Sequence, residues 1–208
     1  MAEPVYAVVV RGLADLGLVA QLSDSVLLDA ARAINAVAPS IRTESARAIL
    51  GQVNFPNSYL NPSAKRLYVS RLAKRGNLEA AITARRRPTS LARFVKGSLK
   101  DKQVGGMSVQ VEAGGKTTQF DKAFVIKLKG ATEAMGNLGL AIRLPKGKAI
   151  RNRHSAVRMA NGLYLLYGPS VQQVFMDNQG EGVAEDMVPL ALEKLADEYT
   201  RLFDLRLR

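Results

Sequence analysis

The strongest constraint on the fold of this chain is a helical period of apolar residues that begins just after Ser23. Residues three and four apart share one face of an α-helix, so the pattern predicts an amphipathic helix with Ser23 as its N-cap and with Arg32 and Asn35 on its polar side. Pro39 lacks a backbone N–H and disturbs a helix interior. Because the period resumes after it, we expect one long helix bent at Pro39, or two helices in series, ending near residues 55–57. The apolar positions are Val26, Leu27, Ala30, Ala31, Ile34, Val37, Ile41, Ala46, Ile49, Leu50 and Val53.

After the turn at residues 61–63 the sequence changes to short runs that are typical of strands. Residues 66–72 and 78–84 predict two strands, and Gly76-Asn77 between them predicts the turn of a hairpin. Three further strands and one N-terminal strand or extended arm complete the expected set. They lie at residues 106–113, 123–128, 138–144 and 4–11.

The C-terminal part predicts one strand and then two helices. The apolar residues 162–167 run into Gly168-Pro169-Ser170, and residues 171–175 then fall at helical spacing, with Pro169 in the first turn. A final helix over residues 183–203 has an apolar side and an acidic side. Its apolar side is expected to hold Met187, Leu190, Leu195, Tyr199 and Leu202.

These elements predict an α+β fold: a long N-terminal helix, packed on a mainly antiparallel β-sheet, with a C-terminal helix. With 208 residues, 47% of them hydrophobic, we expect one domain over residues 1–208, with residues 1–22 as an N-terminal strand or arm and residues 177–208 as an acidic C-terminal helix. The chain has no run of eighteen apolar residues and no secretory signal at its start. We therefore expect a soluble protein made in a cytoplasm, without a membrane partner.

Charge is distributed unevenly over the chain. The formal net charge is +12, although residues 177–204 hold eight acidic residues against two basic ones. A basic body with an acidic segment suits nucleic acid, head-to-tail docking between copies, or solubility alone. The basic candidates for a DNA-facing or inter-subunit surface are Lys65, Arg66, Arg71, Lys74, Arg75, Arg85, Arg86, Arg87, Lys146, Lys148, Arg151 and Arg153, and the acidic inter-subunit candidates are Glu181, Glu185, Asp186, Glu193 and Asp197.

Catalytic chemistry finds little support in the sequence. The chain has no cysteine, which excludes disulfides and thiolate metal sites, and it has one histidine, His154, which we interpret as a solvated loop residue. Ser23, Ser25 and Ser170 have only His154 as a possible base. Residues 114–117 lack the first glycine of a phosphate-binding loop and favour a hairpin turn. We expect no enzyme, no cofactor and no metal.

Recognition of nucleic acid by base stacking is equally weakly supported, because Tyr68 and Phe94 are the only aromatic residues near the basic hairpin. Any contact with DNA is expected to depend on charge and to be independent of sequence. The basic run at residues 146–154 either follows phosphates or is a loop that orders in an assembly.

Four segments resemble the minor tail protein Z family of tail completion proteins in siphophages and prophages. The most specific is residues 165–175, Leu-Leu-Tyr-Gly-Pro-Ser-Val-Gln-Gln-Val-Phe, which resembles that family's strand-to-helix segment. Residues 28–35 leading into Arg42, Ser45 and Ala46 resemble its alanine-rich first helix. Residues 92–94 and the strand at 123–128 are also similar. Pro39 and the acidic C-terminal helix depart from the family pattern.

The resemblance implies a virion component that is added late in tail assembly, in the bacterial host cytoplasm, and allows finished tails to join DNA-filled heads. Implied partners are further copies of the chain in a ring, with sixfold symmetry, the tail terminator or tail tube protein, and neck or connector proteins on the head side. Genomic double-stranded DNA is a further contact.

Within such a ring, the acidic face of residues 181–198 is expected to meet the basic hairpin of residues 65–87 of the next copy. The alternative function is a basic architectural protein that binds DNA independently of sequence. For Gly168, Pro169 and Ser170 we expect a structural turn, and for Gly168 the alternative is direct contact with a partner.

Overall fold

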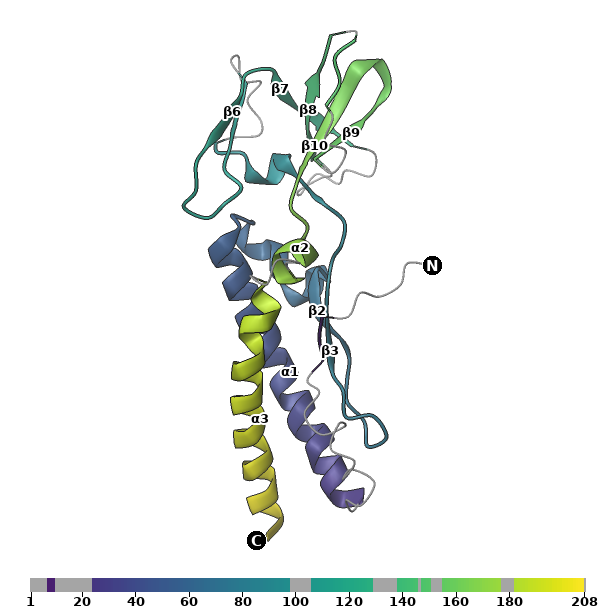
Figure 1. The fold of residues 1–208 in the computed structure, drawn as a ribbon, viewed down its shortest axis with the longest axis vertical. Coiled ribbons are helices and arrows are strands. Elements are labelled where there is room, and N and C mark those ends of the chain that lie inside the picture. Colours follow the sequence, from purple (N-terminus) through teal and green to yellow (C-terminus); the bar gives the residue numbers. More distant parts are fainter. Residues whose placement is uncertain are drawn as a thin grey trace. The chain divides into compact units, whose positions relative to one another are not determined.

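The computed structural model describes the backbone of residues 7–9 and then residues 24–97, 106–128, 138–145, 147–150, 155–176 and 182–207. The α+β class is confirmed: a long N-terminal helix, antiparallel strands and a C-terminal helix follow one another along the chain (Figure 1). The chain divides into two compact units, and a single domain over residues 1–208 stays a prediction. Unit 1 comprises Met1–Ile49, Tyr59–Arg86 and Val171–Arg208, and unit 2 comprises Leu50–Ser58 and Arg87–Ser170.

Unit 1 contains a three-stranded antiparallel sheet in the order β1-β3-β2. Its strands are β1 (Ala7–Val9), β2 (Leu67–Arg71) and β3 (Ala81–Ala84), and its helices are α1 (Asp24–Gln52), α2 (Val171–Met176) and α3 (Val183–Leu207), with 3-10 turns at Asn57–Leu60 and Pro62–Ala64. The predicted hairpin is confirmed, because β2 pairs with β3 and Tyr68 lies opposite Thr83. At its end, Lys74 and Asn77 exchange two backbone hydrogen bonds of 2.8 Å.

The core of unit 1 forms on the buried face of α1. Five alanines, Ala30, Ala31, Ala33, Ala38 and Ala46, are at most 8% exposed and alternate with Ile34, Val37, Ile41 and Ile49. Their small side chains let neighbouring segments approach the helix closely. Leu195 and Tyr199 of α3 pack against the same cluster, and Figure 1 shows α1 and α3 running side by side.

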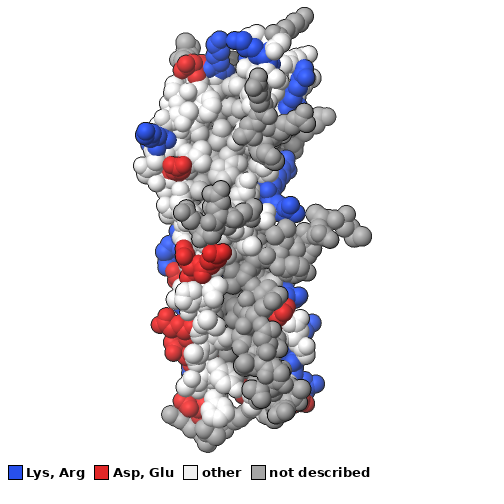
Figure 2. All heavy atoms as spheres, in the orientation of Figure 1, with Lys and Arg blue, Asp and Glu red and all other residues white. Residues whose placement is uncertain are grey.

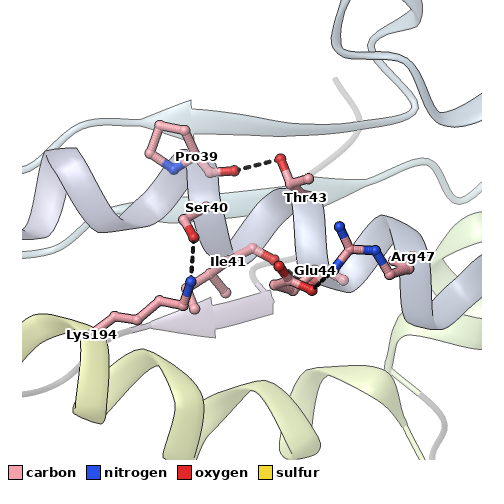
Figure 3. A network of polar contacts seen from close by, with 8 residues as sticks. Pro39, Ser40, Ile41, Thr43, Glu44, Arg47 and Lys194 are labelled. Carbon is pink, nitrogen blue, oxygen red and sulfur yellow. Dashed lines mark hydrogen bonds and ion pairs between the residues drawn. The ribbon is translucent and has the colours of Figure 1, made fainter.

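Pro39 does not divide the N-terminal helix, since α1 continues through it to Gln52. Pro39 is exposed, and it lacks the backbone N–H that would donate one helical hydrogen bond. The buried residues on both sides of it nevertheless belong to one continuous core face. The Thr43 hydroxyl donates to the Pro39 carbonyl, and Lys194 of α3 donates to the Ser40 hydroxyl at 2.8 Å (Figure 3). The first of these hydrogen bonds lies within α1, and the second is a tertiary contact directly beside the proline.

The helix also ends earlier than residues 55–57. Ala113 N–H donates to the Gln52 carbonyl, and Asn54 N–H donates to the Val111 carbonyl. Backbone pairing with residues 111–113 thus replaces the helical hydrogen bonds after Gln52. Ser23, the predicted N-cap, lies outside the described residues.

Asn35 is half-buried, and its assignment to the polar side of the helix was wrong. Its side-chain amide donates to the Ala73 carbonyl at 2.9 Å and accepts from the Ala73 N–H at 2.7 Å. One side chain thus satisfies both backbone groups of a residue that leaves strand β2. The pair joins positions 38 residues apart and fixes the hairpin to α1.

We predict that Asn35→Ala lowers the free energy of unfolding by about 1–3 kcal/mol, because it leaves two partly buried backbone groups without their partners. Asn35→Asp should lie between this variant and wild type, since a carboxylate accepts from the Ala73 N–H but cannot donate to its carbonyl. Urea denaturation measures both changes. Asn57→Ala, at an exposed position, is the control; equal losses for Asn35→Ala and Asn57→Ala would contradict the role of the pair.

Unit 2 is built around a second antiparallel sheet in the order β4-β10-β8-β7, with β9 also paired to β10. The strands are β4 (Thr89–Ser90), β7 (Ala123–Lys127), β8 (Leu138–Arg143), β9 (Ala156–Arg158) and β10 (Leu163–Gly168), and a separate hairpin joins β5 (Met107–Val109) to β6 (Thr118–Phe120). The strands expected at 106–113, 123–128, 138–144 and 162–167 correspond to β5, β7, β8 and β10. Short strands β4, β6 and β9 were not predicted.

Gly168 is the last residue of strand β10 and lies against buried side chains of unit 2. A Cβ atom there would lie 3.0 Å from Leu91 Cδ2 and 3.1 Å from Phe94 Cε2. Leu91 and Phe94 belong to a buried 3-10 turn (Leu91–Phe94), and the Phe94 ring packs at 5.4 Å between centroids against Phe55. The glycine therefore permits close packing of this strand on two buried side chains. Pro169 precedes α2, which begins at Val171, so Pro169 lies outside the helix rather than in its first turn.

We predict that Gly168→Ala destabilises the protein by about 1–2 kcal/mol, since the added methyl forces Leu91 and Phe94 apart in a packed core. Gly51→Ala is the matched control, because Gly51 lies near the end of α1 with no atom near the position of a Cβ. There the same substitution should stabilise the helix by about 0.5–1 kcal/mol. Thermal unfolding followed by circular dichroism measures both; a Gly168→Ala variant as stable as wild type would refute the packing argument.

Candidate interaction surfaces

The C-terminal helix α3 presents one buried and one acidic side. Of the predicted apolar side, Met187 is buried and the other four residues, Leu190, Leu195, Tyr199 and Leu202, are half-buried. Val183, Ala184 and Ala191, which the prediction did not include, are buried as well. Figure 2 shows acidic side chains gathered along α3. The carboxylates of this surface, which we call the acidic row, belong to Glu185, Asp186, Glu193 and Asp197, and all four residues are exposed.

Both basic residues of α3 whose side chains are described have partners close by. Lys194 donates to Ser40, and Arg201 donates to both carboxylate oxygens of Glu198 at 2.8 and 2.7 Å. The hydrogen bonds from Arg201 hold the pKa of the Glu198 carboxyl below its ordinary value. Within the described part of the chain, the four carboxylates of the acidic row have no ion pair. The negative charge of this surface is thus not neutralised by ion pairs from the described residues of unit 1.

An exposed apolar row also runs along α3. Val188, Leu192 and Phe203 are 45%, 50% and 42% exposed. Their spacing of four and eleven residues places them on one face of the helix, with Glu185 beside them and with Asp186, Glu193 and Asp197 roughly a third of a turn away. Branched and aromatic side chains in a row, beside uncompensated carboxylates, are typical of a surface that a partner covers.

The basic hairpin is less available for outside partners than its sequence indicates. The Arg66 guanidinium stacks 4.1 Å from the centre of the Tyr59 ring and donates to the Tyr59 carbonyl at 2.9 Å. Arg71 pairs with Glu79 at 2.5 Å, and Arg75 pairs with Asp24 at 2.9 Å. The first two arginines are partly buried, so their positive charges stabilise the hairpin within unit 1.

The remaining predicted cations occupy several surfaces. Lys65, Lys74, Arg86 and Arg87 are exposed, and among the described residues no hydrogen bond or ion pair is recorded for their side chains. Arg85 is half-buried, and its carbonyl accepts from the Gln172 N–H at the start of α2. Arg87 and the exposed Lys148 belong to unit 2. Lys146, Arg151, Arg153 and Glu181 lie outside the described residues.

The turn between β2 and β3, residues 72–77, combines an exposed apolar side chain with positive charge. Leu72 is 54% exposed, and Lys74 and Arg75 follow it. Three contacts hold the turn: the Asn35 pair to Ala73, the two hydrogen bonds between Lys74 and Asn77, and the ion pair from Arg75 to Asp24. The sequence indicated the cations of this turn, but it placed Leu72 within the strand over residues 66–72 and Asn35 on the polar side of the helix, and neither pattern shows the contacts that the fold gives them.

One cation of α1 is structural. Arg42 is 7% exposed, and its Nε donates to the Leu67 carbonyl at 2.9 Å, while its second terminal nitrogen has no hydrogen-bond partner among the residues that the structure describes. Burial lowers the pKa of this guanidinium. Arg42 therefore ties α1 to strand β2.

In the described part of the chain, no group of potential catalytic or metal-binding side chains gathers in one cleft. No group of three or more His, Asp or Glu residues there is placed to hold a metal ion. Residues 114–116 form the turn region of the β5–β6 hairpin, where Gly114 has φ +71° and Gly115 N–H donates to the Glu112 carbonyl. His154 and Ser23 lie outside the described residues, and Ser170 is buried. Among the helices described, none has the length and apolar character needed to span a bilayer.

In comparisons with known proteins, no family model, no curated protein and no solved structure matches this chain.

Proposed function

We propose that this chain is a non-enzymatic structural protein of a tailed bacteriophage. It acts at the head-proximal end of the tail, in a ring of copies around the DNA channel, and enables head–tail joining. The resemblance of residues 165–175 and of the alanine-rich first helix to tail completion proteins supports the place in the virion. The surfaces of unit 1 support the ring.

The observation that carries the proposal is the surface of α3. Four carboxylates without ion pairs among the described residues lie beside an exposed apolar row, in a chain whose net charge is +12. Such a surface repels phosphates and attracts a basic, partly apolar protein surface. The chain itself carries one on its hairpin, so further copies of the chain are suitable partners.

The alternative, an architectural protein that binds DNA, is favoured by the exposed cations Lys65, Lys74, Arg86, Arg87 and Lys148. Against it, Arg66, Arg71 and Arg75 of the same hairpin already have partners in unit 1. Fewer free cations mean fewer phosphates neutralised and a weaker salt dependence of binding.

We predict that deletion of the coding sequence from the phage or prophage that carries it yields DNA-filled heads beside separate, complete tails. Negative-stain electron microscopy of the lysate shows both particles directly. Complementation with the wild-type sequence is the control and should restore joined, infectious particles. Normal particles from the deletion strain would contradict the joining role.

If the deletion strain makes normal particles, the salt dependence of DNA affinity then tests the architectural alternative. A protein that coats DNA by neutralising six to ten phosphates loses roughly a thousandfold or more in affinity between about 50 and 200 mM salt. Normal particles together with that loss would establish the architectural alternative.

A further inference from the structure

Helix α3 carries two features that a single partner can satisfy together. Its apolar row, Val188, Leu192 and Phe203, exposes nonpolar surface, and its acidic row lies on the same solvent-facing half of the helix. Burying the apolar row favours association, whereas the uncompensated carboxylates select partners that bring positive charge. The fitting partner is a small protrusion with an apolar side chain beside an exposed cation.

The turn at residues 72–77 has this composition. Leu72 supplies exposed apolar surface and Lys74 supplies an exposed positive charge on the same turn, whereas Arg75 is paired with Asp24. Hydrogen bonds at both Ala73 and Lys74 hold its backbone in one conformation, so little conformational entropy is lost when it binds. It is a preorganised counterpart to the surface of α3.

One copy does not bring these two surfaces together. The sheet of unit 1 has the order β1-β3-β2; α3 contacts β1 at one edge, and the turn begins at the end of β2 at the other edge. Figure 1 shows α1 between α3 and the hairpin, and the Asn35 pair holds the turn on α1. Two different surfaces of one unit are therefore available to two neighbouring copies.

We propose that the turn at residues 72–77 of one copy docks on the apolar and acidic rows of α3 of the next copy, with Leu72 packing against Leu192 and Lys74 facing the carboxylates of Glu193 and Asp197. The contact is heterologous, because each copy offers both halves, and it generates a closed ring or an open filament according to the rotation between copies. It deepens the proposed function by naming the interface of the ring, and it involves residues of unit 1 alone.

Charge reversal on the two halves tests the interface in the full-length protein. Variant A carries Lys74→Glu, which leaves the ion pair of Arg75 with Asp24 intact, and variant B carries Glu193→Lys and Asp197→Lys. Alone, each variant presents like charges across the contact, and its association should weaken at least about tenfold compared with wild type. In an equimolar mixture, the acidic turn of A faces the basic α3 of B, and the basic turn of B faces the acidic α3 of A. The mixture should recover association with both variants in each particle.

Analytical ultracentrifugation of wild type, A, B and the mixture gives the masses and affinities. Circular dichroism confirms that A and B are folded. Leu192→Ser should also weaken wild-type association at least about tenfold, while Val157→Ser, at a 50% exposed position in unit 2, should leave it unchanged.

Two results would overturn the interface: a wild-type chain that stays monomeric at about 100 μM, or a mixture of folded A and B that associates no better than either variant alone. Both outcomes are independent of the deletion phenotype. A deletion strain with unjoined heads and tails, combined with a failed mixture, would retain the joining role and place the contact elsewhere.

Discussion

Unit 1 depends on the buried, alanine-rich face of α1, which contacts both the β2–β3 hairpin and α3. Small side chains allow close approach but contribute little specific geometry, so polar contacts set the positions of the neighbours. Asn35 holds Ala73, Arg42 holds Leu67, and Lys194 reaches Ser40. These contacts fix the turn at residues 72–77 on one side of the helix and α3 on the other. The packing around this one helix thus sets the positions of both surfaces of the proposed interface.

Much of the fold was predictable because the spacing of apolar residues along a long segment indicates which of its faces is buried. The buried faces of α1 and α3 follow from helical spacing, and the hairpin follows from Gly76-Asn77 between two strand-like runs. Strands β4, β6 and β9 were missed because two or three residues, many of them exposed, carry no measurable alternation. At Pro39 the sequence predicted one long bent helix or two helices in series, and the structure has a single helix, with a core face that is continuous on both sides of the exposed proline.

The candidate surfaces were predictable in composition but not in pairing. The acidic side of α3 follows from spacing along one helix. The sequence does not show which arginines are already paired. Asp24 lies 51 residues before Arg75, and the fold alone brings the Tyr59 ring to Arg66. The exposure of Leu72 and of the apolar row on α3 was equally invisible, since a sequence pattern shows an apolar residue but not whether anything covers it. Charge composition indicated many available cations, and the structure reduces that number.

The central claim, that the turn of one copy meets α3 of another, is tested most directly by site-specific cross-linking. The chain contains no cysteine, so Leu72→Cys and Leu192→Cys variants each carry a single thiol. After mild oxidation of their mixture, we predict a covalent dimer whose linkage between positions 72 and 192 is identified by mass spectrometry of its peptides. A disulfide requires Cβ atoms within about 4.5 Å, so its formation reports direct contact. The account is contradicted if this linkage is absent, or if it forms no faster than one between Leu72→Cys and a Val157→Cys control.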